Sequence, residues 1–94
     1  MVIRELDLQQ LGFEKVVITP EESGDPLGFY YYELSLSDEN ENFCLVSQES
    51  DKVNDDIWMV KLFETGDYIF QMRDELKDFI SSVLKYKKSI TINP

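Results

Sequence analysis

The most regular pattern in the sequence is the alternation of side chains between Phe29 and Ser37. Tyrosine or leucine occupies every second position, at Tyr30, Tyr32, Leu34 and Leu36. A period of two residues is typical of a β-strand, because successive side chains of an extended backbone point to opposite faces. The polar segment 38–42 then predicts a turn, and Phe43 to Gln48 is predicted to return as the partner strand of a hairpin.

Two further segments favour strands. Phe13 to Ile18 is rich in β-branched residues and stops at Thr19-Pro20, where proline lacks the backbone donor that a sheet requires, so we expect a first strand at a sheet edge. Residues 19–28 hold two of the three prolines and two of the four glycines, and are expected to form an exposed loop. Ile57 to Phe63 is apolar at nearly every position, which predicts a central strand covered on both faces.

Helical spacing appears near both ends of the chain. Leucines at positions 6, 8 and 11 are followed by Gly12, which suits the left-handed position after a helix, so one or two helical turns are expected there. A second set of apolar residues at helical spacing consists of Met72, Leu76, Phe79, Ile80, Val83 and Leu84, and predicts a helix that buries this stripe. Its start is left open between a cap at Asp67 and a short strand through Tyr68-Ile69-Phe70.

Together these elements predict an α+β fold. About four antiparallel strands form a meander, with a short N-terminal helix and a long C-terminal helix packed on one face. A chain of 94 residues supports one hydrophobic core, so residues 1–94 are interpreted as a single domain. The 43% of hydrophobic residues is enough to build that core and argues against intrinsic disorder.

Charge is distributed very unevenly. Residues 16–51, which we call the base-free segment, carry nine carboxylates and neither Lys nor Arg, and the whole chain has a formal net charge of −10. Such a surface repels nucleic acid and anionic membranes and attracts a partner protein with a basic surface. A basic cluster, Lys85, Lys87 and Lys88, falls late in the predicted C-terminal helix, where the helix dipole favours cations, so we do not interpret it as a nucleic-acid site.

The usual groups of catalysis are largely missing. The sequence has no histidine, which removes the common general base near neutral pH and the commonest transition-metal ligand. The single cysteine, Cys44, lies in an apolar stretch of a predicted strand and is interpreted as a buried structural thiol rather than a nucleophile. We therefore expect no enzyme activity, no cofactor and no metal site.

One segment partly matches a calcium-binding loop. Asp38, Asn40 and Asn42 occupy the first, third and fifth positions of the EF-hand pattern, and Glu49 occupies the twelfth. The sixth position, where the sharp turn requires glycine, is Phe43. Because the flanking residues also favour strands over helices, we interpret the segment as a hairpin turn.

Composition also bears on the compartment. A single cysteine excludes an internal disulfide and fits a reducing cytosol. The first residues lack the basic start and long apolar run of a signal peptide, and no apolar stretch approaches the roughly 20 residues of a membrane span. We expect a soluble protein of the cytoplasm.

Four consecutive aromatic residues, 29–32, pose a packing problem. In an extended strand their rings project alternately to both faces, so a helix on one face cannot bury them all. Either the N-terminal segment covers Phe29 and Tyr31, or these two rings form an exposed aromatic patch flanked by acidic residues. An exposed patch of this composition is typical of a protein-binding surface or a homodimer interface.

Several short segments resemble parts of one group of proteins. The segments are Leu8-Gln9-Gln10-Leu11-Gly12-Phe13-Glu14-Lys15, Tyr30-Tyr31-Tyr32-Glu33-Leu34, Trp58-Met59-Val60-Lys61-Leu62-Phe63 and Glu75-Leu76-Lys77-Asp78-Phe79-Ile80. They resemble small uncharacterised proteins of Bacteroidetes and their phages, which share a helix ending in Leu-Gly-Phe, a strand meander, a central Trp and a closing helix. The resemblance implies no catalytic motif. It does imply one class of function, because small acidic phage proteins often inhibit host nucleases stoichiometrically, as anti-CRISPR proteins do.

The sequence thus favours a non-enzymatic protein-binding module. Its sharpest version is an inhibitor that places an acidic surface in the basic groove of a nucleic-acid-binding enzyme; the alternative is a small structural or accessory subunit whose exposed aromatics form a homomeric interface. The candidate partner-binding residues are Glu21, Glu22, Asp25, Phe29, Tyr31, Glu33, Asp38, Glu39 and Glu41.

Overall fold

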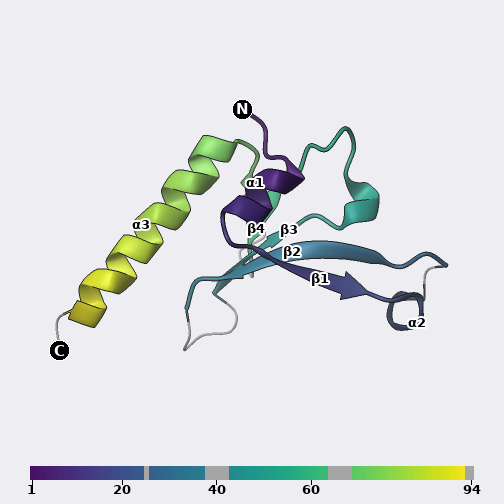
Figure 1. The fold of residues 1–94 in the computed structure, drawn as a ribbon, viewed down its shortest axis with the longest axis horizontal. Coiled ribbons are helices and arrows are strands. Elements are labelled where there is room, and N and C mark those ends of the chain that lie inside the picture. The colour runs from purple at the N-terminus through teal and green to yellow at the C-terminus, as the bar shows by residue number, and fades with distance from the viewer. Residues whose placement is uncertain (25, 38–42, 64–68, 93–94) are drawn as a thin grey trace.

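The computed structural model describes residues 1–24, 26–37, 43–63 and 69–92, with the backbone alone for Ser23 and for 84–92. Within these residues one antiparallel sheet contains β1 (Glu14–Ile18), β2 (Phe29–Ser35), β3 (Cys44–Ser47), β4 (Val60–Leu62) and β5 (Ile69–Phe70), in that spatial order. The helices are α1 (Glu5–Gln10), α2 (Pro20–Ser23) and α3 (Arg73–Ile92), and a 3-10 turn, η1 (Ser50–Lys52), follows β3. Figure 1 shows α1 lying over the sheet, with α2 and α3 toward opposite ends. The predicted α+β meander is confirmed.

The fifth strand resolves the question of where the C-terminal helix begins. Phe70 pairs with Val60, and Ile69 pairs with Lys61, so residues 69–70 extend the sheet before the chain turns into a helix. Helix α3 then starts at Arg73, whose backbone N–H donates to the carbonyl of Met1 at 2.8 Å. Of the two starts that the sequence left open, the short strand is the one observed.

The strand register places the core on one face of the sheet. Leu34 faces Leu45, which in turn faces Leu62, so three leucines form one row across β2, β3 and β4. A second row, shifted by two residues, runs from Ser47 through Val60 to Phe70. The predicted alternation of β2 is confirmed on this face, where Tyr32 and Leu36 are almost fully buried.

This face is covered by segments from both ends of the chain. Ile3, Leu8 of α1 and Leu76 of α3 are fully inaccessible to solvent, and Ile80 of α3 is 4% exposed. Burying each such side chain stabilises the fold by roughly 1.5–3 kcal/mol. Helix α1 ends as predicted, with Gly12 in the left-handed region at φ 93°, where a residue without a Cβ atom is favoured.

Three aromatic rings join the N-terminal segment to the sheet. The ring centroids of Tyr32 and Tyr30 lie 5.6 and 6.2 Å from that of Trp58. The Tyr32 hydroxyl donates to the Glu5 carboxylate at 2.7 Å and accepts from the Gln9 amide at 3.1 Å. The hydroxyl of this buried tyrosine is therefore satisfied by α1, which removes the penalty of burying it.

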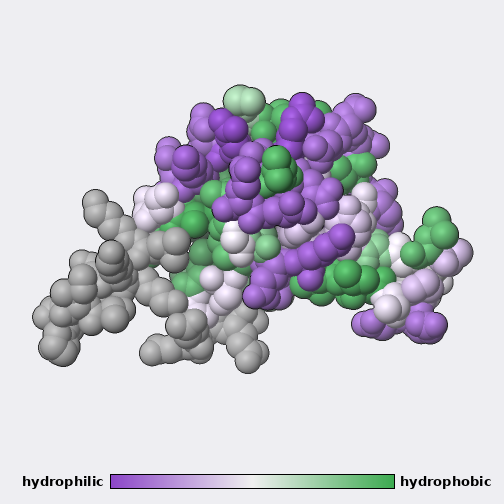
Figure 2. Space-filling view, in the orientation of Figure 1, coloured by the Kyte–Doolittle hydropathy of each residue, from purple (hydrophilic) through white to green (hydrophobic). Residues whose placement is uncertain are grey.

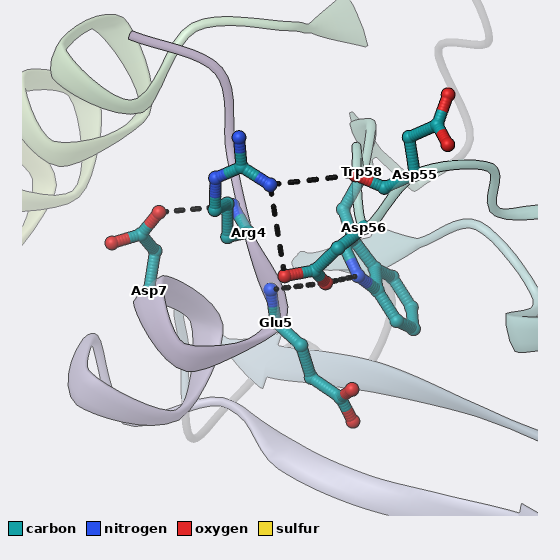
Figure 3. A network of polar contacts seen from close by, with 6 residues as sticks. All are labelled: Arg4, Glu5, Asp7, Asp55, Asp56 and Trp58. Carbon is teal, nitrogen blue, oxygen red and sulfur yellow. Dashed lines mark hydrogen bonds and ion pairs between the residues drawn. The ribbon is translucent and has the colours of Figure 1, made fainter.

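A polar network fastens the N-terminal segment to the turn before β4 (Figure 3). The Trp58 backbone N–H donates to the Ile3 carbonyl at 2.8 Å. One carboxylate oxygen of Asp56 accepts from the Trp58 indole N–H at 2.9 Å and from the Glu5 backbone N–H at 3.1 Å, while its other oxygen lies 4.0 Å from the Arg4 guanidinium. Asp56 thus links the N-terminal segment to the start of the chain segment that leads into β4.

The turn that carries Asp56 has an unusual backbone. Asp55 and Asp56 both have positive φ, 55° and 56°, and the Ile57 N–H donates to the Asn54 carbonyl at 3.0 Å. Two successive left-handed residues form the tight turn that normally favours Asn-Gly. The polar contacts of Asp56 explain why a residue with a side chain occupies the second of these positions.

The run 57–63 and the loop 19–28 differ from their predictions. Only Val60–Leu62 forms β4, and Phe63 is 42% exposed, because the helices that bury side chains pack on one face of the sheet. Within 19–28, residues Pro20–Ser23 form a helical turn, because Thr19 and Glu22 cap it reciprocally, Thr19 Oγ1 accepting from the Glu22 N–H.

Two predictions of burial also fail. Met72 was expected in the buried helical stripe but is 42% exposed, because it precedes α3 and pairs with Val2 as part of an isolated bridge. Phe79 and Val83 are half-buried against the core, and the side chain of Leu84 lies outside the described residues. Cys44 is half-buried rather than buried, because it faces away from the leucine row.

We expect opposite effects from glycine at the two left-handed positions. Asp55→Gly relieves backbone strain, and should raise the free energy of unfolding by up to about 1 kcal/mol. Asp56→Gly relieves the same strain but removes the carboxylate that binds Arg4, Glu5 and Trp58, so it should lower that free energy by about 2 kcal/mol. Urea unfolding of both variants tests the pair; equal shifts would show that the carboxylate contacts contribute nothing.

Truncating two side chains near the start of α3, Leu76 and Met72, should lower the free energy of unfolding by different amounts, because one is in the core and the other is exposed. Leu76→Ala empties a fully buried site and should lower the free energy of unfolding by about 3 kcal/mol. Met72→Ala removes a side chain that is 42% exposed and should lower it by less than about 1 kcal/mol. Thermal unfolding of the two variants gives the comparison, and a larger loss for Met72→Ala would reverse our assignment.

Candidate functional site

The second face of the sheet is the candidate site, and we call it the open face. Its side chains alternate with those of the core, so the register identifies them directly. Glu14 faces Glu33, which faces Val46, which faces Lys61, which faces Ile69. One row of open-face positions therefore crosses all five strands.

Apolar side chains dominate the middle of the open face. Those that line a hollow of about 950 Å³ are Ile18, Phe29, Tyr31, Val46, Met59, Phe63 and Ile69, together with the Cys44 side chain. Most of them are only half-buried, and Phe63 and Ile69 are 42% and 49% exposed. A contiguous apolar surface of this kind in a soluble domain is typical of an interaction site.

The opposite side of the molecule has a different character. Figure 2 shows mainly hydrophilic residues over α1, with hydrophobic residues reaching the surface beside β1. Lys15 lies on that side, because it pairs with Tyr32, and its ammonium lies 4.0 Å from the centroid of the Tyr30 ring. The N-terminal segment covers this face, whereas Phe29 and Tyr31 lie on the open face. Of the two alternatives that the sequence left open for these rings, cover by the N-terminal segment is therefore not observed.

The hollow has a mostly acidic rim. Glu22 of α2, Glu33 of β2 and Glu49 line it, and the cations among its lining residues are Lys52 and Lys61. Lys52 is already engaged, because its ammonium lies 3.8 Å from the Glu49 carboxylate. Lys61 lies in the middle of the face, between Val46 and Ile69.

Two carboxylates face each other at the β1 side of the open face. Glu14 and Glu33 are direct cross-strand partners, a placement that is destabilising for like charges. No ion pair found among the described residues involves either of them. The fold therefore holds two acidic side chains together, with no described cation paired to either of them.

Tyr31 lies beside this acidic pair. Burial raises the pKa of its hydroxyl above the ordinary value, and the negative charge of Glu33 raises it further, with a smaller contribution from Cys44. The hydroxyl is therefore neutral throughout the physiological range. It can donate or accept a hydrogen bond, while its ring supplies apolar contact area.

The structure brings together part of the site that the sequence predicts. Four of the nine candidate residues line the hollow, namely Glu22, Phe29, Tyr31 and Glu33. Glu21 is exposed on α2. The remaining four, Asp25, Asp38, Glu39 and Glu41, lie outside the described residues. So do residues 38–42 of the segment that partly matches a calcium-binding loop.

Sequence reasoning missed the far side of the hollow. Val46, Met59, Lys61, Phe63 and Ile69 come from β3, from β5 and from the segment around β4. A signal was present, because the run 57–63 is apolar at positions of both parities. This pattern was interpreted as burial on both faces of the sheet. In the structure, the odd-numbered residues Met59 and Phe63 line the open face instead.

Other kinds of site find little support in the described part of the chain. No group of three or more metal-ligating side chains occurs there, and none of its helices has the length and apolarity to cross a membrane. Comparison of the chain with protein-family models, with curated proteins and with solved structures finds no match. The functional argument therefore begins with the geometry of the open face.

The charge of Glu33 should be measurable in the titration of Tyr31. In the Glu33→Gln variant the Tyr31 pKa should fall toward its ordinary value of about 10, yet stay above it, since burial remains the larger cause. A group whose pKa is raised by folding stabilises the fold below its unfolded pKa and loses that contribution as pH rises through its folded pKa. Stability above about pH 10 should therefore decline less steeply in the variant.

Carbon-13 NMR of the tyrosine Cζ atoms follows this titration directly. Glu75→Gln, an equal charge change on an exposed position of α3, is the matched control and should leave the Tyr31 titration unaltered. If Glu33→Gln also left the Tyr31 titration unaltered, the conclusion that the Tyr31 and Glu33 side chains lie close together on the open face would be wrong.

Proposed function

We propose that this chain is a non-enzymatic protein-binding module that holds its partner on the open face of its sheet. The observation that supports the proposal is the contiguous set of half-exposed apolar side chains, with Phe29 and Tyr31 among them, in a hollow with an acidic rim. Aromatic side chains in such a position act as interface anchors, because they bury a large area at a low entropic cost.

The chemistry of the hollow favours a protein partner over other ligands. Glu22, Glu33 and Glu49 repel the phosphates of nucleic acids and of anionic lipids. The apolar side chains that line the hollow, which we call the apolar floor, are best buried by an apolar surface of the partner. A protein surface with both apolar and basic side chains satisfies both conditions.

Inhibition of a nucleic-acid-binding enzyme is the sharper version of this proposal. The base-free segment and the net charge of −10 suit a partner whose basic groove normally binds nucleic acid. The resemblance to proteins of Bacteroidetes phages supports the same class, which includes anti-CRISPR proteins. The inhibitor would act stoichiometrically in the cytoplasm and perform no catalytic step.

A homomeric accessory subunit is the second candidate. The exposure of Phe63 and Ile69 on the open face favours it, because apolar rows on two copies can pack against each other as in a sandwich. It differs from the first candidate in one measurable respect. The partner on the open face would be a second copy of this chain.

Site-specific photocrosslinking in the source cells tests the proposal. A photoreactive phenylalanine analogue replaces Tyr31 on the open face, or Leu6 on α1, which is 61% exposed and serves as the matched control. We expect a discrete crosslinked species from position 31 and none of that mass from position 6. A species of twice the chain mass would favour the homomeric subunit.

Two results would contradict the proposal. One is the same crosslinked species from positions 6 and 31, which would place the contact surface elsewhere. The other is the absence of any species from position 31 while circular dichroism shows the substituted protein to be folded.

A further inference from the structure

We propose that the open face binds an amphipathic α-helix of its partner, with the apolar stripe of that helix on the apolar floor and its Lys or Arg side chains against Glu14 and Glu33. This inference rests on the proposed function and specifies the partner's chemistry. Four observations carry it: the position of the apolar residues, the width of the hollow, the charges on the rim and the unneutralised carboxylate pair.

The apolar residues present their side chains on a face of the sheet, and this surface is not made of the backbone groups of an edge. Partners that add a strand use the backbone of an edge, and here one edge strand, β5, is only two residues long. A sheet face is instead buried by a helix or by another sheet. Tyr31, Val46 and Met59 come from neighbouring parts of the sheet and present side chains rather than backbone groups.

The width of the apolar floor suits one helix. Residues from β1 to β5 line the hollow, which spans four strand spacings or about 19 Å. An α-helix with its side chains is roughly 10–12 Å across, so one helix fits over these strands and two do not. A helix contributes a stripe of apolar side chains at every third or fourth position, and such a stripe can pack along a contiguous apolar surface of this width.

Charge decides between a helix of another protein and a second copy of this chain. Among the described residues, the open face carries the carboxylates of Glu14, Glu22, Glu33 and Glu49 against the ammonium groups of Lys52 and Lys61, an excess of two negative charges. Two copies packed face to face would bring together like-charged rims on molecules of net charge −10. A basic partner meets attraction instead.

The carboxylate pair gives the basic side chains of the partner a defined place. Glu14 and Glu33 are opposed across β1 and β2, and no ion pair of the described residues involves either one. Their repulsion is a feature of the free protein that a Lys or Arg side chain placed between them removes. Binding of a basic helix is therefore favoured by the relief of this repulsion as well as by burial of its apolar stripe.

Designed peptides test the inference with a defined probe. The first is a helical peptide of about 18 residues with Leu on one face and Lys on the other. The second keeps the Leu stripe and carries Glu in place of Lys, and the third has the composition of the first in a scrambled order without a stripe. Calorimetry measures affinity, and NMR shift changes report the surface that is bound.

We expect only the first peptide to bind, with the largest shift changes at Tyr31, Val46 and Met59. Replacing both Glu14 and Glu33 by Gln should weaken binding about fivefold to tenfold, and raised salt should have a similar effect. The double variant Asp74→Asn, Glu75→Gln makes the same charge change at exposed positions of α3 and should leave the affinity unchanged. Tyr31→Ala should speed dissociation on the order of tenfold.

The possible results separate this inference from the proposed function. If the Leu/Glu peptide binds as tightly as the Leu/Lys peptide, the partner's charge plays no role. If the α3 double variant weakens binding as much as the Glu14 and Glu33 double variant, the effect comes from net charge and not from this carboxylate pair. Either result overturns the inference. If no peptide binds while position 31 still crosslinks to a partner, the helix is the wrong occupant and the proposed function stands. If position 31 crosslinks to nothing as well, both fail.

Discussion

The fold depends on filling one face of a sheet from segments at both ends of the chain. Ile3 and Leu8 come from the first residues and Leu76 from α3, and together they cover the leucine row of the central strands. The Trp58 N–H donates to the Ile3 carbonyl and the Arg73 N–H donates to the Met1 carbonyl, and these two hydrogen bonds hold the segments in place. Such contacts join residues that are far apart in the sequence, a feature that slows folding.

The same constraint leaves the open face uncovered by the described helices. Apolar side chains remain half-exposed there, and Glu14 opposes Glu33 without a neutralising cation among the described ion pairs. Both features reduce the stability of the free protein, and both would be relieved by one basic, apolar partner. Sites that violate the rules of a stable fold in this way are typical of function, which is why the proposal centres on this face.

Local periodicity made much of the fold predictable. The alternation of β2 identified its buried face, and the apolar spacing of α3 located Leu76 and Ile80. What periodicity cannot show is which face of a sheet receives the helices, since this depends on contacts between distant segments. The run around β4 was therefore interpreted as doubly covered, and the far half of the hollow was missed. The acidic rim was predicted only in part, because charge along a sequence does not reveal which carboxylates converge.

The most direct test of this account is the solvent accessibility of methyl groups in the free, dilute protein. A soluble gadolinium chelate broadens the NMR signals of accessible methyl groups. The account predicts strong broadening for Val46, Met59 and Ile69 on the open face, and protection for Leu8 and Leu45 in the core. Equal protection of all five would show that the open face is already covered, and would contradict the proposal that it awaits a partner.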